Sequence, residues 1–129
     1  MALPVVLDDD DDAAIRRAVI VFGLWVAELA LGGIGSRSTV LAHPRREAVI
    51  SESMMQLDVQ PAEMETLTRY RAASQRFSFL DHRAANWVFG EEIARVLTRD
   101  GDFAITAPAA AWAIHALKAV DEAMPRIGG

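Results

Sequence analysis

Apolar residues dominate one long segment near the start of the chain. Residues 18–35 read AVIVFGLWVAELALGGIG, and the first ten of them carry no charge. At 100° per residue, this segment has an apolar stripe and an opposite side that is almost as apolar. The stripe holds Ile15, Val19, Phe22, Val26 and Leu29, and the opposite side holds Ile20, Leu24 and Leu31. A helix that is apolar nearly all round is buried or faces a partner chain. We therefore predict a central core helix, with a homodimer seam as the second choice.

The same segment is too short and too interrupted for a membrane span. A spanning helix needs about 20 predominantly apolar residues, whereas the uninterrupted run here is ten residues long. Glu28 follows that run, and an acidic residue near the centre of a span costs about 2.5–3.5 kcal/mol in lipid. The glycines at positions 32, 33 and 35 then end the pattern. We expect no membrane partner.

Four more helical segments follow, separated by short connections. They are predicted over residues 44–57, 61–76, 81–98 and 106–124, from apolar positions at helical spacing and from Pro44 and Pro61 at helix starts. Five helices joined by short loops are typical of an all-α fold. The predicted architecture is a compact bundle of about five helices around the central hydrophobic first helix.

Caps and core positions follow from the same pattern. Asp12 is the predicted N-cap of the first helix, and Thr106, with Pro108 just inside, is the predicted N-cap of the last. In the helix over 44–57 the predicted core positions are Ala48, Val49, Met54 and Met55. The inner sides of the next three helices are predicted to hold Leu67, Tyr70, Ala73 and Phe77; His82, Ala85, Phe89, Ile93 and Val96; and Ala109, Trp112, Ala113, Ala116, Val120 and Ala123.

Length and charge narrow the class of protein. The 129 residues are predicted to form one helical domain, 1–129, with a short acidic N-terminal arm over residues 1–12. We interpret the acidic run Asp8–Asp12 as a solvated lead that suits the positive end of a helix, rather than as a weak site for divalent cations. A signal peptide has a basic start, so this acidic lead favours a cytoplasmic protein. Twelve arginines against one lysine, with abundant alanine, are typical of a bacterial chain.

One short motif suggests phosphotransfer chemistry. His115-Ala-Leu-Lys118 resembles the H-x-L-K core of histidine phosphotransfer domains, which are also small acidic helical bundles. The resemblance implies that His115 accepts a phosphoryl group and that Lys118, one turn on, helps to balance its charge. The family's usual glycine after the lysine is Ala119 here.

Histidines elsewhere suggest a ligand site rather than a metal site. His82 and Asn86 lie four residues apart on a predicted helix, beside the core stripe. Such a polar pair binds a ligand or, more commonly, satisfies a neighbouring backbone group. The E-x-x-H and H-E-x-x-H spacings of metal sites are absent, and the glycine-rich GGIGSR at 32–37 reads as a helix cap. We predict no metal and no cofactor.

Arginines gather in one segment with interleaved aromatic residues. Residues 69–83 contain Arg69, Arg71, Arg76 and Arg83 against a single acidic residue, Asp81. Arginine beside aromatic rings grips phosphate and stacks bases, although arginines more commonly pair with carboxylates. A net charge of −5 disfavours non-specific binding to nucleic acid. Nucleic-acid binding is therefore possible but not favoured.

No set of residues combines a nucleophile, a base and an orienting group, so we predict a protein that is not an enzyme. The absence of cysteine also excludes disulfides and thiolate chemistry. The leading hypothesis is a small helical interaction or regulatory protein that acts through protein–protein contacts, as a homodimer and with an unidentified second protein. Trp25 and Trp87 are the predicted interface residues. The alternatives are a nucleic-acid-binding regulator that uses residues 69–83 and phosphotransfer through His115.

Overall fold

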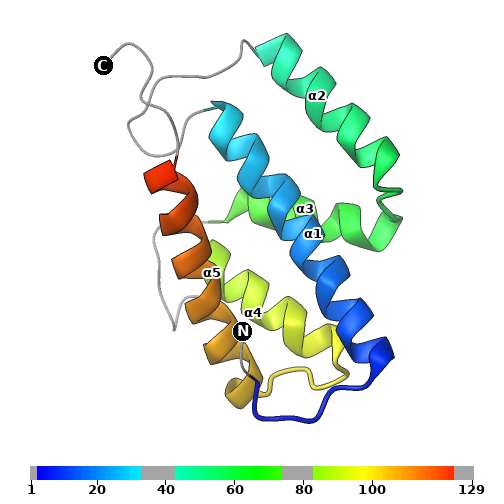
Figure 1. Ribbon diagram of the computed structural model, residues 1–129, viewed down its shortest axis with the longest axis vertical. Coiled ribbons are helices and arrows are strands. Elements are labelled where there is room, and N and C mark those ends of the chain that lie inside the picture. The colour runs from blue at the N-terminus through cyan, green and yellow to red at the C-terminus, as the bar shows by residue number, and fades with distance from the viewer. Residues whose placement is uncertain (1–2, 33–42, 74–82, 124–129) are drawn as a thin grey trace.

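The computed structural model describes residues 3–32, 43–73 and 83–123, and five α-helices account for most of them (Figure 1). The helices are α1 (Asp9–Gly32), α2 (His43–Gln56), α3 (Pro61–Ala72), α4 (Ala85–Val96) and α5 (Phe103–Ala123). The described residues contain no strand, and helices pack directly against helices. The predicted all-α bundle is confirmed. Helix α1 contacts each of the other four helices, and α4 and α5 form the most extensive pair.

Both predicted N-caps are wrong by a turn of helix. Helix α1 begins at Asp9, and Asp8 caps it: the Asp11 N–H donates to Asp8 Oδ1 at 2.7 Å, and the Asp8 N–H donates back to Asp11 Oδ2 at 3.2 Å. The last four residues of the predicted acidic arm, including Asp12, therefore lie inside the helix. Any aspartate in this run could act as the cap. Asp8 does so because its side chain and that of Asp11, three residues on, accept hydrogen bonds from each other's backbone N–H groups.

Helix α5 also begins earlier than predicted. The Ala104 N–H donates to Asp102 Oδ1 at 3.0 Å, which makes Asp102 the N-cap in place of Thr106. Thr106 is buried in the first turns of the helix, and Pro108 lies inside it. Proline lacks an N–H, so the helix loses one backbone hydrogen bond at that position.

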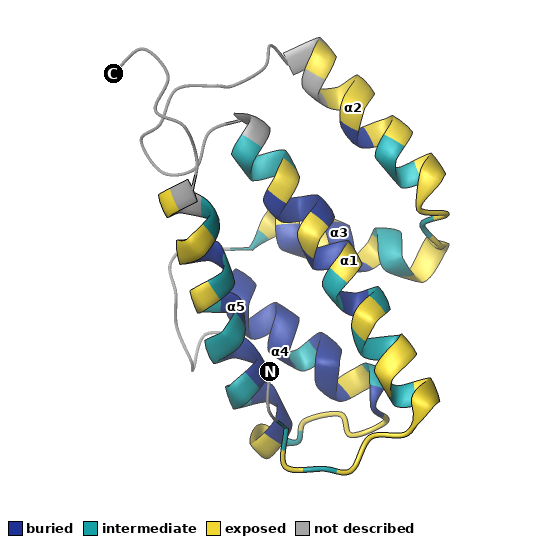
Figure 2. Ribbon diagram, viewed as in Figure 1, coloured by how far each residue is buried: buried dark blue, intermediate teal, exposed yellow. Residues whose placement is uncertain are grey.

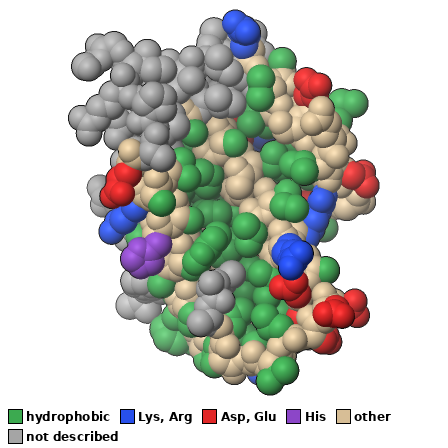
Figure 3. Space-filling model, in the orientation of Figure 1, with side chains coloured by type: hydrophobic (Ala, Val, Ile, Leu, Met, Phe, Trp, Pro, Cys, Tyr) green, Lys and Arg blue, Asp and Glu red, His purple; other side chains and the backbone are tan. Residues whose placement is uncertain are grey.

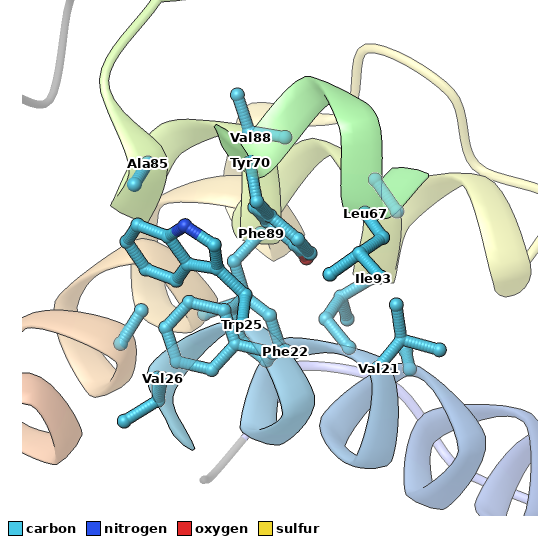
Figure 4. Close-up of a cluster of buried hydrophobic side chains, with 14 of the residues drawn as sticks. Val21, Phe22, Trp25, Val26, Leu67, Tyr70, Ala85, Val88, Phe89 and Ile93 are labelled. Atoms are coloured by element: carbon cyan, nitrogen blue, oxygen red, sulfur yellow. The ribbon is translucent and has the colours of Figure 1, made fainter. Parts of the chain in front are cut away.

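Aromatic rings from α1, α3 and α4 meet in the main core (Figure 4), and Trp112 of α5 packs against its edge. The Phe22 ring of α1 lies 5.4 Å from Tyr70 of α3, 4.7 Å from Phe89 of α4 and 6.4 Å from Trp112 of α5, between ring centroids. Trp25 stacks on Tyr70 at 5.6 Å. Helix α1 therefore makes its aromatic core contacts through Phe22 and Trp25.

Small residues bring α4 and α5 close together. Gly90 of α4 is buried against Thr106 of α5, and a Cβ added at Gly90 would lie 3.0 Å from the Thr106 side chain and would overlap the Thr106 carbonyl oxygen. On α5, Ala109, Ala110 and Ala113 are fully buried. Of the stripe predicted for this helix, Ala109 and Ala113 are buried as expected, whereas Trp112, Ala116 and Val120 are only half-buried at the edge of the core.

Helix α2 lies at the edge of the bundle and most of its surface is exposed (Figure 2). Ile50 is its buried residue, with 6% of its surface exposed, and Met54 is half-buried. The predicted core positions Ala48, Val49 and Met55 are wrong, because all three are exposed. A short helix with few apolar residues carries too weak a periodicity to define its inner face.

Left-handed residues end α2 and α4. Asp58 has a φ of 52° and Thr98 a φ of 56°. After α4, the Thr98 N–H donates to the Arg95 carbonyl at 3.0 Å and the Arg99 N–H donates to the Ala94 carbonyl at 2.8 Å. This pair of hydrogen bonds is the Schellman pattern, in which glycine is the usual left-handed residue.

Candidate functional site

The arginines of residues 69–83 that the structure describes have partners within the chain. Arg71 Nε lies 3.0 Å from Glu28 Oε2, and Arg69 Nη2 lies 4.0 Å from Glu91 Oε1. Arg83 is exposed and also interacts within the chain. Arg76 lies outside the described residues. Carboxylates of α1 and α4 therefore pair with Arg71 and Arg69, and binding of nucleic acid by this segment stays a prediction.

Both predicted interface tryptophans are buried inside the chain. Trp25 has 3% of its surface exposed and belongs to the main core, and Trp87 has 6% exposed. Trp87 forms a second small core with Ala84 and Ala110, and its ring lies 5.9 Å from that of Phe103. The prediction that these two side chains anchor a partner is wrong, because neither is accessible. The sequence separates Trp87 from the inner stripe of α4, but α5 covers that side of the helix as well.

The predicted histidine sites have different outcomes. His82 lies outside the described residues, so its pairing with Asn86 stays a prediction; Asn86 itself is fully buried and interacts within the chain. His115 and Lys118 are both exposed on α5. Within the described residues, no group of three histidine or acidic side chains gathers as a metal site.

An apolar face extends across α1 and α5. The residues that form it are half-buried or exposed at the edge of the main core: Ile15, Val19, Trp112, Ala116, Ala119 and Val120. We call this set the α1–α5 face. Figure 3 shows hydrophobic side chains gathered over these two helices in the middle of the visible surface. Helix α5 carries no acidic residue and a single lysine between Phe103 and Val120.

Helix α5 also meets a simple length and composition test for a membrane span. Over Phe103–Val120 it is long and apolar enough to cross a bilayer, and a third of that window is buried in the chain. Core helices of soluble proteins meet the same test, so the finding identifies an apolar helix and no more.

A cleft opens between α1, α3 and α4, and sequence reasoning did not find it. Its volume is about 200 Å³, and it is lined by Ala14, Arg17, Ala18, Val21, Glu63, Thr66, Glu92, Arg95 and Val96. We call it the α1–α3–α4 cleft. Two arginines and two glutamates face it, so its ionised side chains sum to zero charge. In the sequence, the available signal for this cleft was the presence of charged residues within two apolar helices, Arg17 in α1 and Glu92 and Arg95 in α4. These residues come together only through the packing of the helices.

Each pair of charges in the cleft is directly hydrogen-bonded. Arg17 Nε donates to Glu63 Oε2 at 2.6 Å, and Arg17 Nη2 donates to Glu63 Oε1 at 2.9 Å and to the Asp58 carbonyl at 2.8 Å. Arg95 Nε donates to Glu92 Oε2 at 3.0 Å, and Arg95 Nη2 donates to Glu92 Oε1. The first pair ties α1 to α3, whereas the second lies within one turn of α4.

The two glutamates differ in their surroundings. Burial raises the pKa of the Glu63 carboxyl, but hydrogen bonds from Arg17 and from the Gln60 N–H outweigh it and hold that pKa below its ordinary value. Glu92 is more deeply buried, with 6% of its surface exposed. Burial raises the pKa of the nearby Tyr70 phenol, and the Glu92 charge raises it further.

No protein-family model, curated protein or solved structure matches this chain.

Proposed function

We propose that the protein is a small non-enzymatic helical interaction protein that acts through protein–protein contacts and associates as a homodimer through the α1–α5 face. The observation that carries this proposal is the apolar, weakly charged surface of α5, of which only a third of the window Phe103–Val120 is buried within the chain. Helices of this composition are normally covered by protein on most sides.

The face forms the apolar centre of the proposed interface. On α5 its residues run from Trp112 to Val120, which corresponds to about 12 Å at 1.5 Å per residue. Two neighbouring helices are about 20 Å wide, so the face itself offers roughly 250 Å² per chain. Specific interfaces bury about 800 Å² per partner, so a stable dimer would draw most of its area from residues around the face.

Trp25 and Trp87 cannot contact a partner, because both are buried within the chain. With Trp25 and Trp87 inside the chain, Trp112 is the remaining tryptophan: it is half-buried at the edge of the core, 5.3 Å from Phe89 between ring centroids. Tryptophan at a partly covered position is common in the energetic centre of interfaces.

Light scattering of the purified chain over a range of concentrations tests the proposal. We expect a dimer at micromolar concentration and an Ala119→Glu variant whose dimer dissociates at least about tenfold more easily, because a charge would be buried against an apolar surface. Ala48→Glu on α2 is the matched control, since Ala48 is also exposed on a helix, and it should leave the dimer unchanged. A wild-type chain that stays monomeric at millimolar concentration, or two variants with equal effects, would refute the proposal.

A further inference from the structure

The floor of the α1–α3–α4 cleft contains a carboxylate that the fold does not explain. Glu92 is the one acidic side chain among the described residues that is buried. Removing a carboxylate from water is costly unless partners compensate for it. Its partner Arg95 lies on the same helix, with 53% of its side chain exposed. The pair therefore links no two helices, in contrast to Arg17 and Glu63.

Hydrogen-bonding capacity remains unused beside this carboxylate. The two oxygens of a carboxylate offer about four acceptor sites, and the hydrogen bonds from Arg95 occupy two of them. The Tyr70 hydroxyl is fully buried and has no hydrogen-bond partner among the described residues. Figure 4 shows the Tyr70 oxygen pointing toward Leu67 and Ile93, on the core side of α4. A group rich in donors would satisfy the vacant acceptor positions on Glu92.

The rest of the cleft is shaped for a compact apolar group. Ala18, Val21 and Val96 line it, and its volume is about 200 Å³. A cavity of about 150 Å³ is large enough to admit benzene, so the cleft can hold a molecule of five to eight non-hydrogen atoms. Arg17 and Arg95 donate through Nε and Nη2 only, so the Nη1 group of each stays available for a ligand carboxylate.

We propose that the α1–α3–α4 cleft binds a small primary ammonium compound that carries a compact apolar group. The ammonium donates hydrogen bonds to the vacant acceptor positions of Glu92, and the apolar group packs against Ala18, Val21 and Val96. The ligand is a simple amine or an amino acid, which differ by a carboxylate within reach of the arginine Nη1 groups. This site is independent of the α1–α5 face.

Three matched probes test the proposal: isobutylamine, isovalerate and valine. Isobutylamine and isovalerate share the same branched apolar group and differ in the sign of their charge, and valine is isobutylamine with an added carboxylate. Each is titrated into the ¹⁵N-labelled full chain at pH 7, and amide shifts are followed at Val21, Thr66 and Val96. We expect saturable shifts with isobutylamine at about 1–10 mM and weaker ones with isovalerate, whose carboxylate can reach only the arginine Nη1 groups. Tighter binding of valine than of isobutylamine would identify an amino-acid site, and weaker binding a simple-amine site; either result supports the proposal.

A substitution at the carboxylate supplies the second test. Glu92→Gln should weaken isobutylamine binding by about tenfold or more, because an amide replaces the charged acceptor. Glu91→Gln is the matched control: Glu91 neighbours Glu92 but does not line the cleft, so affinity should stay within about twofold. No shift with isobutylamine, equal shifts with isovalerate, or equal affinities of the two variants would overturn the proposal and leave the cleft as a water site. The comparison of the two probes needs no variant, so it decides the question even if Glu92→Gln fails to fold.

Discussion

Arg17 of α1 lies 2.6 Å from Glu63 of α3, between Nε and Oε2, and the same guanidinium also binds the carbonyl of Asp58 at the end of α2. One side chain thereby joins α1 to α3 and to the turn that connects α2 with α3. The glutamate side chain is 17% exposed and that of the arginine is 35% exposed, so water screens the pair only in part.

The pair makes stability depend on pH in a defined direction. The folded-state pKa of Glu63 is lowered, so its contribution is fully present above its ordinary pKa of 4.5 and is lost as the pH falls through the folded-state value. We expect Glu63→Gln to lower the free energy of unfolding at pH 7 by about 1 kcal/mol, the upper end for a partly screened pair. Urea unfolding at pH 7 and pH 3 measures this, and the gap from wild type should shrink at pH 3.

Glu65→Gln is the control for that prediction. Glu65 is exposed on the same helix and makes no ion pair within the described residues, so its substitution should leave the free energy of unfolding within about 0.5 kcal/mol at both pH values. A gap between wild type and Glu63→Gln that does not change with pH would contradict the proposed electrostatic origin.

Two glycines should respond in opposite directions to alanine. Gly90→Ala forces a methyl group against Thr106 across the α4–α5 contact, and we expect a loss of about 1–3 kcal/mol in the free energy of unfolding. Gly23 lies in α1 with no atom near its added Cβ, so Gly23→Ala should gain about 0.5–1 kcal/mol from helix propensity. Denaturant unfolding of both variants measures the difference. Equal effects of the two substitutions would mean that α4 and α5 do not approach as closely as described.

Two neighbouring residues on α2 test which face of that helix is buried. Ile50 is 6% exposed, and Val49 is 44% exposed. We expect Ile50→Ala to cost about 2 kcal/mol in the free energy of unfolding and Val49→Ala to cost less than about 0.5 kcal/mol. The same urea experiment measures both. A larger cost at Val49 would restore the orientation predicted from sequence.

The end of α4 offers a stabilising substitution. Thr98 has a left-handed backbone, which costs a residue with a Cβ about 1–2 kcal/mol, while glycine loses about 0.5–1 kcal/mol more entropy on folding. We therefore expect Thr98→Gly to raise the free energy of unfolding by about 0.5–1 kcal/mol. Thr68→Gly, within α3, should lower it instead, by about 0.5 kcal/mol. Thermal unfolding distinguishes the two, and a loss at Thr98 would show that its side-chain contacts outweigh the backbone strain.

Local patterns in the sequence were enough to predict the five helices and the buried residues along their most apolar sides. Phe22, Tyr70, Phe89 and Ile93 were predicted to face the core and are buried, because a long apolar period of 3.6 residues reports locally on which side of a helix avoids water. The same periodicity could not identify which aspartate caps α1. It also gave the wrong inner face for α2, because that helix has too few apolar residues to define a stripe.

The contacts of the other helix sides depend on how the helices pack, which no local pattern in the sequence reports. Trp87 is off the main stripe of its helix yet buried, because α5 covers it. Arg17 meets Glu63 across 46 positions and Arg71 meets Glu28 across 43. Periodicity carries no information about such distant partners, since it is a property of single helices. The cleft and the apolar face are each formed by side chains from two or more helices. Both therefore depend on which helices pack against each other, and the sequence alone did not predict them.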